Sequence, residues 1–348
     1  MKILLTADPE IPVPPVLYGG IERIVDILVQ EYVKQGHEVS LFAHSDSQVP
    51  CRLLSWKAKR SGGISNTMMN AFQLWRHLLK EEYDVVHSFS RLGYLTPVLS
   101  SPILKVMSYQ REPTIAQIQR AAKISRKGSL FFTGCSDYIT NKIKPFAEAA
   151  TVYNCVPIDK YQFCTAVCKD APLVFLGRIE PVKGTHLAVE VAQRTGRQLI
   201  IAGNIPAEGI AYFDEKIKPF LTDRISYIGP VNDLQKNDLL GSASAFLMPI
   251  QWNEPFGIVM AEAMACGTPI LGFPYGSVPE VVDDGITGFV CKDVNEMIAA
   301  VDKINQIDRR IVRNKAEKEY SGQTIAEKYL RLYTARIQNS KSYGAAVG

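Results

Sequence analysis

Short apolar runs that alternate with amphipathic segments constrain the fold of this 348-residue chain more than any other feature. The first run, residues 2–7, is followed by apolar residues at Ile21, Ile24 and Leu28, which is the spacing of one face of an α-helix. The alternation ends near residue 153 and starts again at residue 172. Because strands that alternate with helices form parallel sheets covered by helices, we predict an α/β protein with two doubly wound, Rossmann-like domains.

The linker between the domains is predicted where this pattern stops. Residues 155–171 show no period, and the chain is too long for one average core. We therefore expect a first domain at 1–165 and a second at 170–320. Ligands bind outside the carboxyl ends of strands in such sheets, so two domains that face each other would hold a ligand in the cleft between them. The polar residues that follow predicted strand ends are His87, Gln110, Ser136, Arg178 and Glu254.

Composition excludes several classes of protein. A net charge of +4, with 47% hydrophobic and 21% charged residues, is ordinary for a soluble protein and indicates no nucleic-acid partner. The seven cysteines form no Cys-x-x-Cys pair and have no histidine at zinc spacing, so we expect reduced thiols in a cytoplasmic protein. No apolar run reaches the length of a membrane span, and residues 1–8 indicate a strand rather than a signal peptide.

Two basic segments, residues 52–60 and 120–127, have two interpretations. They can form solvated faces, which is the more common role of such groups. They can also contact an anionic membrane or an acidic, lipid-linked molecule, which would put the protein at the inner face of a membrane.

The stretch 254–262 carries two carboxylates, Glu254 and Glu262, around the start of a predicted helix. The N–H groups of Phe256 and Gly257 lie at the helix N-terminus, where they can hold a phosphate. The carboxylates could accept hydrogen bonds from hydroxyls of the same ligand. Glu254 could instead complement the helix dipole, whereas Glu262, in an apolar helix, needs a polar partner under either interpretation.

Two further loops are candidates for ligand contact. Arg178 and Lys183 lie across a six-residue loop, so they can neutralise a diphosphate or form a solvated surface pair. Gly19 and Gly20 precede the first helix, where they can form a tight turn or let the backbone approach a ligand closely.

These motifs resemble a known family when they are taken together. LGR at 176–178, KG at 183–184, EPFG at 254–257 and PEVV at 279–282 occur in the order and spacing of the nucleotide-sugar domain of retaining glycosyltransferases of the GT-B fold, glycosyltransferase family 4. YGG at 18–20 and DVVH at 84–87 match the first domain of that family more weakly. The final helix, 321–348, resembles the one that packs back on the first domain, which is expected to be the acceptor side.

The resemblance implies a role for each motif in the second half of the chain. Arg178 and Lys183, with Gly177 beside them, would hold the donor diphosphate. Glu262 would bind the ribose hydroxyls and Glu254 those of the donor sugar. The backbone contacts to sugar and phosphate would come from Phe256, Gly257 and Ile258, and the base would lie near Val231.

In the first half, Gly19 and Gly20 would close over the phosphates. The family often has a histidine after the strand at 105–109, and this chain has Gln110 in its place. A glutamine can donate the same hydrogen bond to the donor sugar, but it does not titrate. His87, at the preceding strand end, would then line the site, or it would bond to nearby backbone.

The family resemblance implies a retaining transfer of a sugar from a UDP, GDP or ADP sugar to a hydroxyl acceptor of a polysaccharide, lipid-linked glycan or glycoside. No Asp-x-Asp motif follows a predicted strand, so we expect no metal and no other cofactor. The alternatives are a sugar-nucleotide epimerase or phosphorylase of the same fold, and a nucleotide-sugar binder without catalysis.

Overall fold

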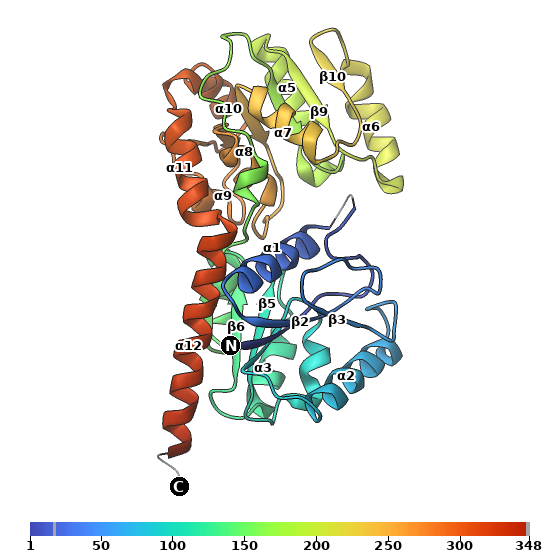
Figure 1. The fold of residues 1–348 in the computed structure, drawn as a ribbon. Helices are drawn as coiled ribbons and strands as arrows, with labels where there is room; N and C mark the ends of the chain where they lie inside the picture. The colour runs from blue at the N-terminus through green and yellow to red at the C-terminus, as the bar shows by residue number, and fades with distance from the viewer. Residues whose placement is uncertain (17–18, 346–348) are drawn as a thin grey trace. The chain divides into compact units, whose positions relative to one another are not determined.

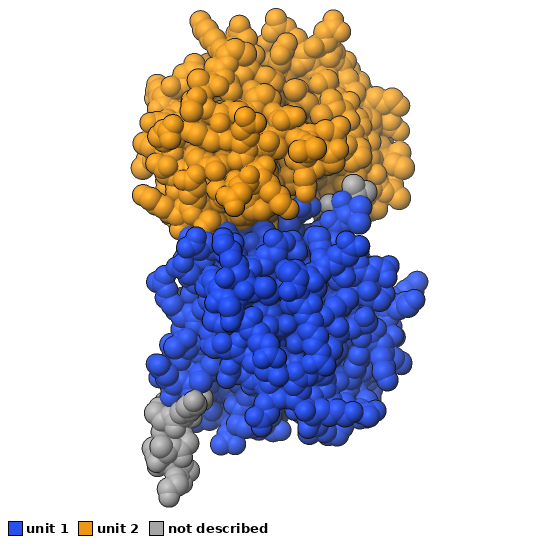
Figure 2. All heavy atoms as spheres, in the orientation of Figure 1, with its two compact units in different colours: residues 1–155, 322–348 blue, residues 156–321 orange. Residues whose placement is uncertain are grey.

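The computed structural model describes residues 1–16 and 19–345, with side chains up to residue 339. Tyr18 of the predicted glycine motif, and residues 346–348 of the predicted final helix, lie outside this part. The chain divides into two compact units, one of residues 1–155 and 322–348 and the other of residues 156–321 (Figure 2). Each unit has its own parallel sheet with helices beside it, which confirms two Rossmann-like α/β domains.

The boundary falls at the beginning of the predicted linker because that segment packs on the second unit. Val156 forms a β-bridge with Ser321, and the N–H of Cys164 donates to the carbonyl of Cys266 at 3.1 Å. Tyr161 is buried as well. A stretch without period can therefore be well packed, since hydrogen bonds to a neighbouring segment replace regular structure.

The sheet of the first unit has the strand order β3-β2-β1-β4-β5-β6-β7, and all its pairs are parallel. Its strands are β1 (Lys2–Thr6), β2 (Glu38–Ala43), β3 (Arg52–Ser55), β4 (Val85–Ser88), β5 (Leu104–Tyr109), β6 (Leu130–Gly134) and β7 (Ala149–Thr151). The central strands are buried on both faces, which explains why they read as continuous apolar runs.

Helices cover this sheet (Figure 1). They are α1 (Gly20–Lys34), α2 (Ile64–Leu78), η1 (Leu92–Val98), α3 (Ile115–Ile124), α4 (Asp137–Ile143) and α12 (Gly322–Ala345). Ser136 caps α4, because its side chain accepts the N–H of Ile139 at 3.2 Å. The final helix belongs to this unit, and the hydroxyls of Tyr32 on α1 and Tyr333 on α12 lie 3.1 Å apart in its core.

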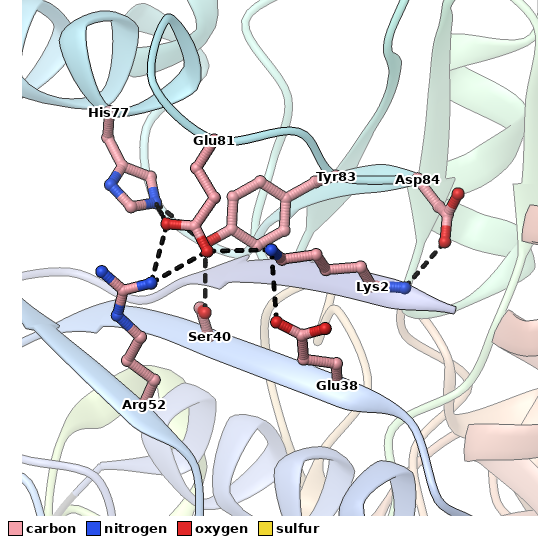
Figure 3. A network of polar contacts seen from close by, with 8 residues as sticks. All are labelled: Lys2, Glu38, Ser40, Arg52, His77, Glu81, Tyr83 and Asp84. Atoms are coloured by element: carbon pink, nitrogen blue, oxygen red, sulfur yellow. Dashed lines mark hydrogen bonds and ion pairs between the residues drawn. The ribbon is translucent and has the colours of Figure 1, made fainter.

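A polar network fastens the end of α2 to the first sheet (Figure 3). Glu81 forms ion pairs with Lys2 at 2.9 Å and with Arg52 at 2.7 Å, and so joins β1 and β3. His77, in the last turn of α2, lies 2.9 Å from the hydroxyl of Tyr83. The helix is therefore anchored by side chains at its C-terminal end as well as by packing.

The second unit has the strand order β10-β9-β8-β11-β12-β13, again all parallel. Its strands are β8 (Leu173–Leu176), β9 (Leu199–Ala202), β10 (Ile225–Tyr227), β11 (Ala245–Met248), β12 (Ile270–Gly272) and β13 (Gly288–Val290). Its longer helices are α5 (Thr185–Thr195), α6 (Ile210–Lys216), α7 (Asp233–Ser242), α8 (Ile258–Ala265), α10 (Val294–Val301) and α11 (Arg309–Tyr320). The short elements are η2 (Ile158–Lys160), η3 (Pro181–Lys183), η4 (Ala207–Gly209), η5 (Lys218–Phe220), α9 (Val278–Val281) and η6 (Ile304–Gln306).

Candidate functional site

Three glycines meet at the carboxyl ends of β8, β9 and β10. The N–H of Gly177 donates to Ala202 at 3.1 Å, and the N–H of Gly203 donates to Gly229 at 2.9 Å. Gly203 has φ +141°, and a side chain there would place its Cβ 1.7 Å from the carbonyl oxygen of Gly177. Only glycine allows this approach, so bare backbone forms this edge of the sheet, where ligands bind in such folds.

The loop after β8 brings Lys183 against the end of β11. Gly184 has φ +74°, and a Cβ at this position would lie 1.9 Å from the carbonyl oxygen of Pro249. The N–H of Gln251 also donates to the carbonyl of Val182 at 2.8 Å. The KG motif at 183–184 therefore has a structural reason, because glycine at 184 lets the lysine loop contact the loop that leads to Glu254.

Lys183 and Glu254 form an ion pair in the second unit. The Nζ of Lys183 lies 2.7 Å from Oε2 of Glu254, and the side chains are 20% and 13% exposed. Trp252 donates its indole N–H to the same oxygen at 3.1 Å, and Nζ of Lys183 lies 4.9 Å from its ring centre. Trp252 was not predicted as a site residue, since an aromatic loop residue has no distinguishing pattern in one sequence.

The loop from Glu254 to α8 is held in one conformation. The carbonyl of Glu254 accepts the N–H of Ser277 at 2.9 Å, and the carbonyl of Phe256 accepts the hydroxyl of Ser277 at 2.9 Å. Gly257 precedes α8 with φ +71°, and the helix begins at Ile258. The N–H of Met260 donates to the carbonyl of Gly257 at 2.8 Å, and the N–H groups of Ile258 and Val259 precede any acceptor inside the helix. Anion binding at this N-terminus remains a prediction.

Glu262 lies inside α8 with a side chain that is 4% exposed. Its Oε1 accepts the hydroxyl of Tyr161 at 2.6 Å and lies 2.5 Å from Nζ of Lys236. This confirms the prediction that the carboxylate needs a polar partner. The identity of these partners was missed because they lie on α7 and in the predicted linker, far from Glu262 in the sequence. Oε2 of Glu262 takes part in neither bond.

The other predicted residues of the second unit lie on the same loops. Arg178 is 43% exposed and pairs with Glu180 at 3.1 Å, so it is separate from the Lys183–Glu254 pair. Val231 is half-buried and precedes α7. That helix begins with a capping box, in which the side chain of Asn232 accepts the N–H of Gln235 at 2.9 Å and Gln235 reciprocates at 3.0 Å. The predicted base site is therefore on a loop of fixed geometry.

In the first unit, Gly19 and Gly20 form the start of α1. Gly19 has φ +152°, and a Cβ there would lie 2.6 Å from Cβ of Pro15 and 2.9 Å from Oε2 of Glu22. Glycine is thus required by the turn itself. Contact with a ligand at these two residues remains a prediction.

His87 is a correction to the predicted site. It is fully buried in β4, and its ring nitrogens lie 2.5 Å from the hydroxyl of Tyr333 and 2.6 Å from that of Ser108. Burial lowers the pKa of His87 to about 3, since the charged form would lose its hydration. Both nitrogens are used inside the core, so His87 joins α12 to β5 and is not placed to contact a sugar.

Gln110 lines a cavity of about 570 Å³ that lies after β4 and β5 in the first unit. Neither atom of its side-chain amide has a hydrogen-bond partner within the described residues, although both atoms are buried. The hydroxyl of Tyr109 and Nε of Arg91, which also line the cavity, have none either. Tyr109 is 8% exposed. Buried polar groups are normally paired, so these groups are suited to hydrogen-bond a ligand.

Positive charge dominates this cavity. Arg91, Arg111 and Arg120 line it, and none of them belongs to an ion pair in the part of the chain that the structure describes. Its carboxylate, Glu112, pairs with Lys142 at 2.6 Å. Asp8 lies nearby, and burial raises its pKa to about 6, with Glu10 adding to the shift while Arg111 and Arg91 oppose it. The sequence did not reveal this cluster, because its arginines come from three separate segments.

The described residues contain neither a candidate metal site nor a membrane-spanning helix. No three His, Cys, Asp or Glu side chains form a group there that could hold a metal ion. None of the helices described in residues 1–16 and 19–345 is long and apolar enough to cross a membrane.

Comparison with known proteins identifies both halves of the chain. A family model described as glycosyl transferases group 1 matches residues 166–319, and one described as glycosyltransferase family 4 matches residues 18–107. A Bacillus subtilis protein that is provisionally named glycosyltransferase YtcC is 25% identical over 341 residues, which cover 85% of this chain and 80% of that protein.

Solved structures agree in fold. AviGT4, a glycosyltransferase involved in avilamycin A biosynthesis, superposes with a TM-score of 0.72 at 24% identity, over 97% of this chain and 98% of that chain. HepE from Anabaena, in complex with UDP-glucose, gives a TM-score of 0.72 at 16% identity, over 96% of this chain and all (100%) of the other. The fold is therefore that of GT-B glycosyltransferases, and the chain belongs to the glycosyltransferases of group 1 and family 4, which its two halves match in turn.

Proposed function

We propose that this glycosyltransferase moves a sugar from a nucleotide-diphosphate sugar to a hydroxyl acceptor, with retention of configuration and without a metal ion. One observation carries the proposal: Lys183 and Glu254 form a partly exposed ion pair on the loop that leads to the N-terminus of α8. A cation, a carboxylate and helix N–H groups in one place match the diphosphate and the hydroxyls of such a donor.

A bound donor would replace the contact between Lys183 and Glu254 with its own contacts to each side chain. In the unliganded protein Lys183 neutralises Glu254 at 2.7 Å. A bound diphosphate would take the contact with Lys183 and would recruit Arg178, which is 43% exposed. Glu254 would then accept hydrogen bonds from the donor sugar, with the N–H of Trp252 still holding it. The cations would also stabilise the charge that develops on the leaving diphosphate.

The nucleoside part would lie against the bare backbone of Gly177 and its neighbours. Glu262 is held by Tyr161 and Lys236 through Oε1, and Oε2 is left to accept the ribose hydroxyls. The base would lie by Val231. The UDP-glucose held by HepE supports a uridine donor, while GDP and ADP sugars remain alternatives.

The acceptor would bind in the cavity of the first unit. Its three arginines, and the unpartnered groups of Tyr109 and Gln110, suit a hydroxyl compound that also carries a phosphate or carboxylate. A lipid-linked sugar phosphate is one acceptor of this kind. Arg111→Ala should raise the KM for such an acceptor about tenfold or more, because a charged hydrogen bond contributes about 1.5–3 kcal/mol. It should leave donor hydrolysis unchanged.

The stereochemistry and the metal independence have separate tests. In the proposed mechanism the acceptor attacks the face that the nucleotide leaves, and a donor phosphate oxygen takes its proton. Proton NMR of the first product should show the anomeric configuration of the donor. Activity should persist in excess EDTA, and loss that a divalent cation restores would contradict the metal-independent mechanism.

The donor class is tested by thermal shift with UDP, GDP and ADP sugars. A donor at about 100 times its Kd adds roughly 2.7 kcal/mol to folded stability, so a matching nucleotide should raise the melting temperature. The shift should be reduced in Lys183→Ala. A non-catalytic binder would show the shift without turnover, and an epimerase or phosphorylase would turn over the donor without sugar transfer to a hydroxyl acceptor.

A further inference from the structure

Helix α2 lies on the outer side of the first unit (Figure 1). One of its faces is apolar and exposed. Its other face is buried through Ala71 and Leu74 and packs on η1. The apolar side chains on the exposed side recur at helical spacing: Ile64, Met68, Met69, Phe72, Trp75 and Leu79. Ile64 is 81% exposed and Phe72 is 52% exposed. Scattered exposed apolar residues are common, but a continuous stripe of this size marks an interaction surface.

The segment that carries this face is basic, and Glu10 contacts it by accepting the N–H of Ser61. Residues 57–80 contain no Asp or Glu. They contain five exposed basic residues, Lys57, Lys59, Arg60, Arg76 and Lys80. None of these five forms an ion pair in the part of the chain described by the structure. The surface therefore combines an apolar stripe with unneutralised positive charge.

The aromatic residues of the stripe suit the boundary between water and lipid. The rings of Phe72 and Trp75 lie 5.5 Å apart, and the guanidinium of Arg76 lies 5.9 Å from the ring centre of Phe72. Tryptophan and phenylalanine on one face, with lysine and arginine beside them, are the composition of helices that lie in the plane of a membrane surface. The anchoring of α2 through His77 keeps this face fixed for docking.

Other occupants of the surface fit less well. In a symmetric dimer through α2, the five cations would face the same five cations of a second copy, which is repulsive. The last segment of the chain, residues 340–348, carries one lysine and no acidic residue, so it offers no complementary charge either. An anionic bilayer provides both the apolar interior and the negative surface that the face requires.

We propose that α2, together with residues 57–60, docks the protein on an anionic lipid bilayer as a peripheral surface helix. The first of the two basic segments, residues 52–60, contributes its last four residues to this surface. Arg120 of the second segment instead lines the cavity. The proposal goes beyond the transfer reaction. It assigns a place for the enzyme at a membrane surface, where a lipid-linked acceptor would be found.

The test is co-sedimentation of the full-length protein with vesicles of phosphatidylcholine alone or with added phosphatidylglycerol. The wild type should pellet with the anionic vesicles only, and less so at high salt. Each cation near an anionic surface contributes about fivefold in affinity, so Lys59→Glu with Arg60→Glu should weaken binding about 25-fold or more. Phe72→Ser with Trp75→Ser should weaken it by about tenfold or more.

Matched variants in the second unit serve as controls. Leu234→Ser removes a side chain that is 77% exposed, and Lys292→Glu reverses a charge whose side chain is 83% exposed. Both should pellet like the wild type. Brominated lipid should quench the fluorescence of the wild type, and Trp75→Phe should lose most of this quenching while it still pellets. Thermal melts check that each variant is folded.

Three outcomes would overturn the proposal. These are absence of pelleting with anionic vesicles at low salt, equal loss of pelleting in the controls, and binding of soluble acidic proteins in place of vesicles. Donor hydrolysis by Phe72→Ser with Trp75→Ser should equal that of the wild type. If the wild-type protein binds vesicles but does not turn over any donor, that result would count against the proposed transferase function alone.

Discussion

The ion pair between Lys183 and Glu254 should break when the donor binds. If Lys183 leaves Glu254 when a donor diphosphate binds, then the two side chains should be energetically coupled in the unliganded protein and uncoupled in the complex. The perturbations are Lys183→Met, Glu254→Gln and the double variant. Methionine keeps the length of the lysine, and glutamine can still accept the N–H of Trp252.

The magnitude follows from the geometry of the pair. Two unit charges 2.7 Å apart interact by about 6 kcal/mol at an effective dielectric constant of about 20. Desolvation of both groups offsets most of this, and a hydrogen bond to a charged group has a net value of about 1.5–3 kcal/mol. Solvent still reaches 20% of Lys183, so we expect a coupling near 1.5 kcal/mol.

The assay is a double-mutant cycle of unfolding free energies. Of the three tryptophans, only Trp252 lies in the second unit, and it touches the pair, so its fluorescence reports the unfolding of this unit. Denaturant titrations are run without ligand and with a saturating concentration of the nucleoside diphosphate whose sugar passes the thermal-shift screen. The coupling should fall below about 0.5 kcal/mol in the complex, which is the value for independent sites.

Lys183→Met should also bind the nucleotide diphosphate about tenfold to a hundredfold more weakly, because one charged hydrogen bond is lost. Lys292→Met, at an exposed site of the same unit, should bind it like the wild type. A coupling that is unchanged by bound ligand, or wild-type affinity in Lys183→Met, would refute the exchange of partners.

Three further changes test other parts of the structure. Gly184→Ala should destabilise the second unit by more than about 3 kcal/mol in the denaturation assay, because its Cβ would meet the oxygen of Pro249 at 1.9 Å. As a control, Gly196→Ala should cost only about 1–2 kcal/mol, because Gly196 has φ +64° but faces open space. Lys105 donates to three carbonyls and one hydroxyl inside the first unit, so Lys105→Met should cost about 3 kcal/mol or more, measured by denaturation followed by circular dichroism. His87 has a pKa of about 3 in the folded protein and an ordinary value of 6.5, so the unfolded chain binds one more proton between these limits. The free energy of unfolding should therefore fall by about 1.4 kcal/mol per pH unit below pH 6.5. His87→Gln should remove that part of the slope in thermal melts from pH 7 to pH 4.

The fold and the positions of the loops at 177–184 and 254–257 could be predicted because their signals are local. The periodicity of apolar residues that predicts strands and helices is visible within short runs of consecutive residues. Gly177 and Gly184 belong to short motifs that can be recognised from consecutive residues, although the backbone that Gly184 meets is that of Pro249. Glu254 lies on the loop just before α8, where the sequence puts it. The need of Glu262 for a polar partner followed from its apolar surroundings alone.

The remaining features depend on contacts between distant segments. His87 ends a predicted strand, but whether such a residue lies at the rim or in the core depends on what packs over it, and here α12 does so through Tyr333. The arginines of the cavity come from separate loops and from α3. The exposed side of α2 was missed because an amphipathic pattern does not reveal that a second apolar stripe stays uncovered.

Turnover of the donor should depend on both Lys183 and Glu254. Release of nucleotide diphosphate from UDP-, GDP- and ADP-glucose, with and without an acceptor, should be seen for at least one donor with the wild type. It should fall by about a hundredfold or more in Lys183→Ala and in Glu254→Ala, because each removes a contact to the developing charge or to the sugar, and it should be unchanged in Lys292→Ala. Turnover that survives both Lys183→Ala and Glu254→Ala would show that the donor site lies elsewhere.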